Sequence, residues 1–133
     1  MVVIYTDGAY SSSRNQGGWA FVATEKDEKL AFGFMGIHDT TNNRMEIQGV
    51  IEACKWAISK NITEITIITD SMYVIGAMSK NWSKKKNSDL WEELDSLVEK
   101  LNITWTHVKG HSGDKYNELC DALAVEASHA KLN

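Results

Sequence analysis

The chain begins with Met1-Val2-Val3-Ile4-Tyr5-Thr6-Asp7-Gly8, an apolar run that leads into a carboxylate. A second apolar run, Ile65-Thr66-Ile67-Ile68-Thr69-Asp70-Ser71, ends in the same Thr-Asp pair. Short apolar runs rich in β-branched residues are typical of buried strands. Aspartate is rarely buried unless it is paired or binds a metal ion, so an aspartate at the end of each strand indicates a cation site.

The apolar pattern also predicts the other elements of the chain. Strands are expected at residues 2–7, 19–23, 30–34, 64–69 and 103–106. Helices are expected at about residues 43–58, 71–80, 88–101 and 115–130, with Asp114 and either Asn87 or Ser88 as candidate caps. This β-β-β-α-β-α-α-β-α order predicts an α/β fold, in which a five-stranded mixed sheet has an antiparallel three-strand meander and flanking helices. All 133 residues fit one domain, 1–133.

The composition predicts a soluble, cytoplasmic protein. The net charge of −4 argues mildly against a nucleic-acid binder with a broad basic surface, although acids that hold divalent ions would leave the remaining surface less negative. Cys54 and Cys120 have no metal-type spacing and are expected to be buried free thiols, as suits a reducing cytosol. The chain shows no signal-peptide pattern and no membrane-spanning run. We expect a monomer with no membrane partner.

The expected topology brings Asp7 and Asp70 to one place. A strand that returns parallel to the first through a helix makes a right-handed crossover, so the first and fourth strands can lie parallel with their carboxyl ends on the same side. Ligands of open α/β sheets bind beyond these ends. We therefore expect both aspartates at one site.

Two further acids, Glu46 and Asp121, are placed to reach this site. Glu46 lies in the first turns of the first helix, on the face of Gly49 and Val50 that turns toward the sheet. Asp121 lies in the last helix among small and apolar residues. For either acid alone, an edge carboxylate bonded to a neighbour fits the spacing equally well.

Four carboxylates in one pocket favour divalent cations. Like charges raise one another's pKa, and two divalent ions supply four compensating charges. Ligands that are all oxygen atoms select Mg2+ or Mn2+ over zinc. Two such ions held close together can clamp the attacking and leaving oxygens of a phosphoryl transfer, so the acids indicate that chemistry.

Short motifs follow one another along the chain: Tyr5-Thr6-Asp7-Gly8, Thr40-Thr41-Asn42-Asn43-Arg44-Met45-Glu46, Thr69-Asp70-Ser71, Asp89-Leu90-Trp91, Val108-Lys109-Gly110-His111-Ser112-Gly113, Asn117-Glu118 and Cys120-Asp121. Any one of them is weak evidence, but their order and spacing together are specific. Over nearly its whole length the chain resembles the type 1 ribonuclease H (ribonuclease HI) family. The resemblance implies a ribonuclease H-like fold.

The resemblance also implies an activity and the residues that perform it. The family consists of metal-dependent endonucleases that cut the RNA strand of RNA/DNA hybrids, which implies a two-metal mechanism that leaves 5′-phosphate and 3′-hydroxyl ends. The implied ligands of two Mg2+ ions, for which Mn2+ can substitute, are Asp7, Glu46, Asp70 and Asp121. The resemblance makes His111 a catalytic residue that helps to move protons or release product, and its glycine-flanked loop and near-neutral titration suit that role.

A zinc site is the alternative role for His111. His107 and His111 have the H-x3-H spacing of zinc ligands. That spacing works on a helix or in a zinc finger, whereas His107 ends a strand and only one cysteine, Cys120, lies downstream. We therefore expect His107 to be a packed or surface residue.

Substrate contacts are expected just before and at the start of the first helix. There Asn42, Asn43 and Arg44 could hydrogen-bond base edges or 2′-hydroxyls in a minor groove, and the helix N-terminus favours a phosphate. The resemblance places minor-groove contacts on Asn42 and Asn43 and a DNA-strand phosphate contact on Thr41. The alternative role for Asn43 is a capping box with Glu46.

Three segments depart from the family pattern. Residues 9–16 replace a turn rich in Gly, Asn and Pro, and Met72 stands where a glutamine that contacts the hybrid is often found. The third segment is residues 81–87, which is short where some members have a basic protrusion. The candidate substrate contacts in this segment are Trp82, Lys84, Lys85 and Lys86. A solvated loop explains the three lysines as well as binding to the DNA strand does.

Other protein classes fit the sequence less well. An integrase or resolvase of the same architecture would lack the Thr-Asn-Asn-Arg-Met-Glu and Lys-Gly-His-Ser-Gly segments together. A noncatalytic hybrid-binding module would lack one of the four acids, and none is missing. A response-regulator-like or flavodoxin-like domain does not begin with a three-strand meander.

Overall fold

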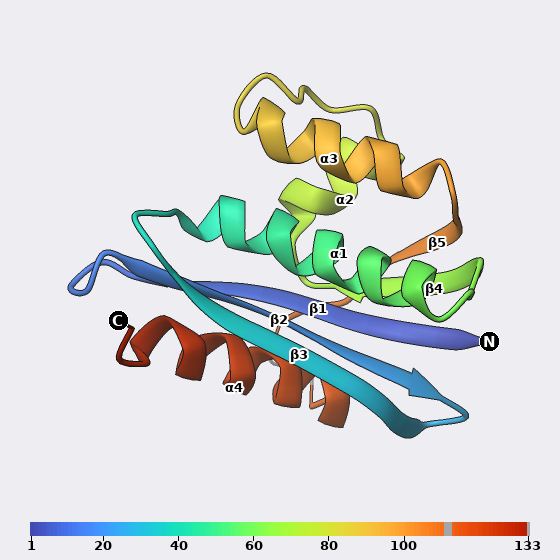
Figure 1. Ribbon diagram of the computed structural model, residues 1–133, viewed down its shortest axis with the longest axis horizontal. Helices are drawn as coiled ribbons and strands as arrows, with labels where there is room; N and C mark the ends of the chain where they lie inside the picture. Colours follow the sequence, from blue (N-terminus) through green and yellow to red (C-terminus); the bar gives the residue numbers. More distant parts are fainter. Residues whose placement is uncertain (111–112, 133) are drawn as a thin grey trace.

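The computed structural model describes residues 1–110 and 113–132. Figure 1 labels its helices and strands, which follow the predicted order. The strands are β1 (Val2–Ser11), β2 (Gln16–Glu25), β3 (Glu28–His38), β4 (Glu64–Thr69) and β5 (Asn102–His107). The helices are α1 (Asn42–Ser59), α2 (Met72–Ser79), α3 (Ser88–Val98) and α4 (Lys115–His129).

The five strands form one mixed sheet in the order β3-β2-β1-β4-β5. β1, β2 and β3 make an antiparallel meander, whereas β4 pairs in parallel with both β1 and β5. The predicted sheet is therefore confirmed. The parallel register pairs Thr6 with Thr69, so Asp7 and Asp70 directly follow the last pair of this ladder.

The three strands of the meander are longer than predicted. β1 continues past its apolar run to Ser11, which pairs with Gln16 at the start of β2. β3 lies at the edge of the sheet, and many of its side chains are exposed. Side-chain patterns follow burial rather than backbone pairing, which is why they underestimate the length of these strands.

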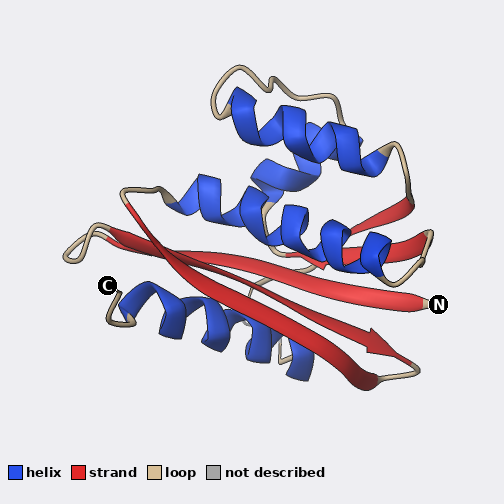
Figure 2. Ribbon diagram, viewed as in Figure 1, coloured by secondary structure: helices blue, strands red, loops and turns tan. Residues whose placement is uncertain are grey.

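Helices cover both faces of the sheet (Figures 1 and 2). α1, α2 and α3 lie on one face, where the larger core cluster includes Ile4, Ile47 and Trp91. α4 lies on the other face over a smaller cluster that includes Val22 and Cys120. Both cysteines are buried and free, as predicted. None of the described helices is long and apolar enough to cross a membrane.

The candidate caps of the last two helices have different outcomes. The side chain of Asp114 accepts hydrogen bonds from the backbone N–H groups of Tyr116 and Asn117, which confirms it as the cap of α4. Asn87 stands at the N-cap position of α3, but its side chain makes no capping bond. The Asn87 side chain instead bonds to Arg44 on α1 and to Tyr73 on α2.

Candidate metal centre

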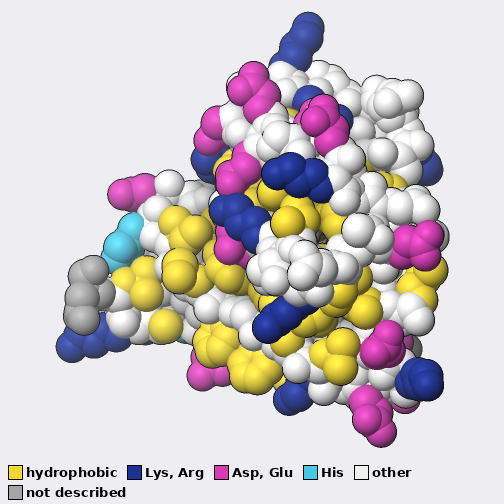
Figure 3. Space-filling view, turned by 45° about the vertical axis from the view of Figure 1, so that its right-hand side comes forward, with side chains coloured by type: hydrophobic (Ala, Val, Ile, Leu, Met, Phe, Trp, Pro, Cys, Tyr) yellow, Lys and Arg dark blue, Asp and Glu magenta, His cyan; other side chains and the backbone are white. Residues whose placement is uncertain are grey.

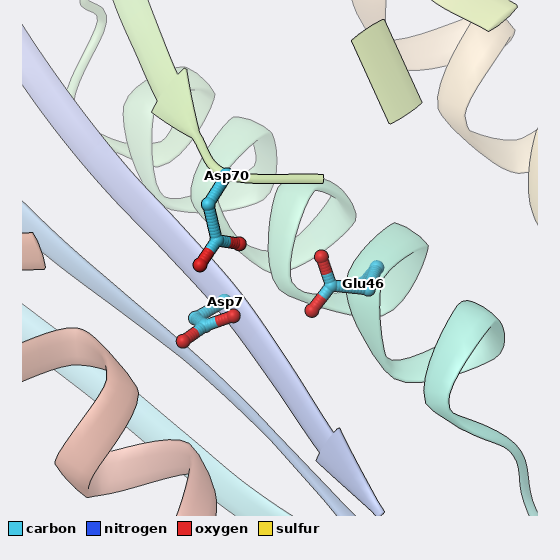
Figure 4. A group of neighbouring side chains, drawn as sticks. All are labelled: Asp7, Glu46 and Asp70. Carbon is cyan, nitrogen blue, oxygen red and sulfur yellow. The ribbon is translucent and has the colours of Figure 1, made fainter. Parts of the chain in front are cut away.

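Three of the four predicted metal ligands converge on one point (Figure 4). Asp7 comes from β1, Glu46 from α1, and Asp70 directly follows β4. One carboxylate oxygen of each residue lies within 4.8 Å of the other two. Asp7 and Glu46 are only 4% and 6% exposed, and Asp70 is partly buried. These three side chains are called the acid cluster below.

A close approach of β1 to α1 holds Glu46 in the acid cluster. The backbone N–H of Gly8 donates to Glu46 Oε1 at 2.6 Å. A Cβ atom on residue 8 would lie 2.5 Å from the backbone nitrogen of Glu46 and from the carbonyl carbon of Met45, so glycine is needed between the strand and the helix. The sequence signal for this contact is the glycine that directly follows Asp7.

Burial and mutual repulsion raise the pKa values of the clustered acids. For Asp7, burial is the largest cause of the raised pKa, followed by the charges of Glu46 and Asp70. Burial is also the main cause that raises the pKa of Glu46 to about 7, although the hydrogen bond from the backbone N–H of Gly8 opposes the shift. The fully ionised cluster therefore needs an opposing charge.

The atoms of the acid cluster fit a divalent cation. Asp7 Oδ2 is buried and has no hydrogen-bond donor among the described residues. Such an oxygen costs free energy when ionised, unless a cation lies beside it. Because the atoms available to bind a metal are all carboxylate oxygens, the cluster favours a hard ion such as Mg2+ or Mn2+.

Asp121 lies beside the acid cluster. It is partly buried on α4, and its interaction with Asp7 is one of the causes that raise the pKa of Asp7. The group of acids linked by distances of up to 4.8 Å contains Asp7, Glu46 and Asp70 but not Asp121. The role of Asp121 as a fourth ligand stays a prediction.

The predicted role of His111 cannot be compared with the structure, because His111 lies outside the described residues. His107, its partner in the zinc alternative, is exposed at the end of β5, and its Nε2 lies 3.3 Å from the backbone oxygen of Asp70. The expectation that His107 is a surface residue is thus confirmed. Gly110 lies against the acid cluster, since a Cβ atom on this residue would lie 3.2 Å from Asp70 Oδ2.

Thr41, and not Asn43, caps α1. Thr41 has an extended backbone, and its hydroxyl accepts a hydrogen bond from the backbone N–H of Arg44 at 3.1 Å. Asn42 and Asn43 are the first two residues of the helix, and both are exposed. The capping-box alternative for Asn43 is wrong, because the helix begins before Asn43 and the side chain of Glu46 turns to β1 instead.

Arg44 is engaged within the protein. Its Nη1 and Nη2 donate to Asp89 Oδ1 and Oδ2 at 3.0 and 2.8 Å, and Nη1 also donates to Asn87 Oδ1 at 3.2 Å. The hydrogen bonds from Arg44 are the main cause that lowers the pKa of Asp89 to about 2. The predicted contact between Arg44 and substrate would have to compete with these bonds.

Residues 81–87, called the basic segment below, connect α2 to α3 and present two lysines to solvent. Lys84 Nζ bonds to Asp95 Oδ1 on α3 at 2.9 Å. Lys85 and Lys86 are exposed, and among the described residues no carboxylate forms an ion pair with them. The three lysines are therefore not equivalent, which the sequence did not indicate.

Trp82, the other candidate contact in the basic segment, folds back on α2. Its backbone N–H donates to the carbonyl oxygen of Gly76 at 3.0 Å, and its ring fills the space that a Cβ atom on Gly76 would need. Lys80 Nζ lies 5.9 Å from the centre of a ring of this indole. The side chain is still 49% exposed, so an open surface remains for a ligand. Met72 is also exposed, in the first turn of α2.

Comparison with known proteins shows the family of this chain. The RNase H family model matches residues 1–129. The chain belongs to the ribonuclease H family. Ribonuclease H of Treponema denticola is 40% identical to it, with 95% of this chain and 96% of that protein covered. Ribonuclease HI of Synechocystis sp. is 41% identical, with 95% and 86% covered.

Solved structures of ribonucleases H share the fold. An N-terminal RNase H domain from Mycobacterium tuberculosis matches with a TM-score of 0.86 at 26% identity, over 96% of this chain and 92% of that one. RNase H1 from Halobacterium salinarum matches with a TM-score of 0.81 at 27% identity, over 95% and 96%. The predicted family, fold and enzyme class are confirmed. Ribonucleases H cleave the RNA of RNA/DNA hybrids, and this member has an acid cluster compatible with metal binding.

Proposed function

We propose that this ribonuclease H hydrolyses the RNA strand of RNA/DNA hybrids by a two-metal mechanism and leaves 5′-phosphate and 3′-hydroxyl ends. The proposed metal is Mg2+, with Mn2+ as a substitute, and its ligands are Asp7, Glu46, Asp70 and Asp121. One observation carries the proposal: one carboxylate oxygen from each of Asp7, Glu46 and Asp70 lies within 4.8 Å of the other two, in a cluster where Asp7 Oδ2 is buried with no donor among the described residues.

The protein's own contribution to the reaction is to hold these oxygens in place before substrate binds. The parallel ladder between β1 and β4 fixes the backbones of Asp7 and Asp70 beside each other, and the N–H of Gly8 fixes Glu46 Oε1. When bound, two divalent ions would clamp the attacking and leaving oxygens of the scissile phosphate. We propose that His111 moves a proton or assists product release, since histidine titrates near neutrality.

We propose that the hybrid lies across the start of α1 and the basic segment. Thr41, Asn42 and Asn43 are exposed beside the turn that carries Glu46, where they can reach the minor groove and a phosphate. Figure 3 shows basic and acidic side chains interspersed on one face, without a broad basic surface. Because affinity for nucleic acid comes largely from phosphate contacts, we expect weak hybrid binding and a high KM.

The proposal is tested by incubating the chain with a labelled RNA/DNA hybrid, an RNA duplex and a DNA duplex, with and without Mg2+. We expect cleavage of the hybrid's RNA strand alone, only with the metal, and products that require dephosphorylation before a kinase can label their 5′ ends. Asp70→Asn is the inactive control, and Glu99→Gln removes an exposed acid from the end of α3 as the matched active control. Hybrid binding without cleavage would instead identify a noncatalytic module.

A further inference from the structure

Arg44 stands where three helices meet. From α1, its guanidinium forms a two-pronged ion pair with Asp89 in the first turn of α3 and a third bond to Asn87. Planar pairs of this kind fix orientation as well as distance. The Arg44 side chain is 32% exposed and that of Asp89 is 64% exposed, so the pair lies at the surface and its value is in geometry rather than in stability.

Asn87 extends this contact to α2. It ends the basic segment in a left-handed conformation, with φ 60° and ψ 33°. Its Nδ2 donates to the hydroxyl of Tyr73 at 3.0 Å, while its Oδ1 accepts from Arg44. The Tyr73 ring packs against Trp91, which is 1% exposed in the core, with ring centroids 5.4 Å apart. The network of Arg44, Asp89, Asn87 and Tyr73 is called the clasp below.

The clasp connects the two parts of the molecule that the hybrid is proposed to touch. Arg44 precedes Glu46 of the acid cluster by two residues on α1, and Asn87 directly follows the exposed Lys86. A duplex has a fixed spacing between its strands, so a protein that grips one strand and cleaves the other needs a fixed distance between the two contacts.

We propose that Arg44 is a positioning residue, which holds the end of the basic segment so that its exposed lysines and the acid cluster can meet one hybrid at the same time. The role replaces the direct substrate contact that the sequence suggested for Arg44. It rests on the proposed function, because it concerns how the hybrid is held for cleavage.

The chain offers a matched pair of variants for the test. Asp89→Asn and Glu93→Gln each remove one negative charge from α3 and one ion pair with α1. Glu93 pairs with Lys55 at 3.0 Å, one helical turn farther from the basic segment. The removal of an acid should by itself strengthen binding to a polyanion. We nevertheless expect Asp89→Asn to raise KM for the hybrid about three- to tenfold with kcat nearly unchanged, and Glu93→Gln to leave both nearly unchanged.

A double-mutant cycle separates positioning from direct contact. If Arg44 acts through Asp89, Arg44→Gln should raise KM as Asp89→Asn does, and the double variant should be no worse than the poorer single one. If Arg44 contacts the hybrid itself, Arg44→Gln alone should raise KM, and Asp89→Asn should leave KM unchanged or lower it. The second result, or an equal rise in KM for Glu93→Gln, would overturn the proposal.

Two further measurements keep the test independent of folding and of catalysis. Tyr73→Phe keeps the ring on Trp91 and removes only the hydroxyl bonded to Asn87, and it should raise KM in the same direction by a smaller factor. Loss of the clasp should also flatten the dependence of hybrid affinity on salt, measured by fluorescence anisotropy in EDTA, because the lysines lose phosphate contacts.

A parent that binds the hybrid without cleaving it would contradict the proposed function alone. Unchanged binding and salt dependence in Asp89→Asn would contradict the clasp alone.

Discussion

Arg44 and Glu46 lie two residues apart on α1, yet the protein handles their charges in opposite ways. The guanidinium of Arg44 meets a carboxylate and an amide oxygen, and the pKa of its partner Asp89 is lowered. The carboxylate of Glu46 meets two other acids, and its own pKa is raised. One turn of helix therefore carries a charge that is paired with an opposite charge beside one that lies among like charges.

The difference indicates what each group contributes. The bonds of Arg44 are complete within the chain, so they can fix geometry without a ligand. Burial and like charge make the ionised acid cluster costly, and the proposed cation would lower that cost.

Asp70→Asn should lower kcat for hybrid cleavage by roughly a thousandfold or more, because loss of a metal ligand removes several kcal/mol of transition-state stabilisation. Steady-state kinetics at saturating Mg2+ measures this effect. The same variant should be as stable as the parent or more stable in EDTA, since one repelling charge is gone. A large loss of stability in urea unfolding would make Asp70 a structural residue and remove the contrast with Arg44.

Mg2+ at a hundredfold excess over its Kd should raise the free energy of unfolding of the parent by about 2.7 kcal/mol, because the ion binds only the folded chain. Thermal unfolding with and without the ion measures the shift. Asp70→Asn should lose most of the response, whereas Glu99→Gln should keep it. Equal responses in all three proteins would place the bound ion away from the acid cluster.

The contributions of Glu46 and of Asp89, the partner of Arg44, to the free energy of unfolding should depend on pH with opposite signs. The pKa of Glu46 rises from 4.5 to about 7 in the folded chain, which therefore holds more protons than the unfolded chain in that interval. Its contribution to stability is present below pH 4.5 and is lost as the pH rises to about 7, by at most about 1.4 kcal/mol per pH unit. The contribution of Asp89, with its lowered pKa, is lost as the pH falls toward about 2.

Urea unfolding of the metal-free parent and of Glu46→Gln at both ends of the interval checks the sign for Glu46. The variant should become more stable relative to the parent as the pH rises, because glutamine does not ionise. A constant difference between the two proteins would mean that Glu46 titrates in its ordinary range, and the cluster would then be no more strained than the surface.

The smallest effects are expected in the basic segment. Lys85→Ala and Lys86→Ala should each flatten the slope of log affinity for the hybrid against log salt by up to about 0.9, with kcat spared. Lys84→Ala should change it less, since Lys84 is already paired with Asp95. KM measured over a range of salt concentrations gives the slopes. If all three variants match the parent, the segment is a solvated loop and the DNA strand is held elsewhere.

The sequence predicts the acid cluster well because its physical signals are local. An aspartate at the end of an apolar strand and a glutamate on the buried face of a helix are both visible in residue patterns, and parallel pairing then brings their elements together. Asp7 and Glu46 are accordingly as buried as expected. The element order follows for the same reason.

The contacts of Arg44 could not be predicted in this way. Its partner Asp89 lies 45 residues away on another helix, and no periodic pattern specifies which exposed side chains will pair. The cap of α1 depends on where the backbone changes from extended to helical, a boundary that two successive threonines and two asparagines leave undecided. The donor to Glu46 is the backbone N–H of Gly8, so the sequence signal for this bond is only the missing side chain of that glycine.

The ladder between β1 and β4 pairs Val2 with Ile65, so the chain must close a long loop before Asp7 and Asp70 meet. Contacts between residues so far apart in sequence form slowly compared with helices. A chain still being synthesised has no acid cluster until β4 and Asp70 have emerged, and α4 emerges later still. In refolding, hybrid cleavage should therefore appear after most of the helical signal has returned, so that activity reports on the last stages of assembly.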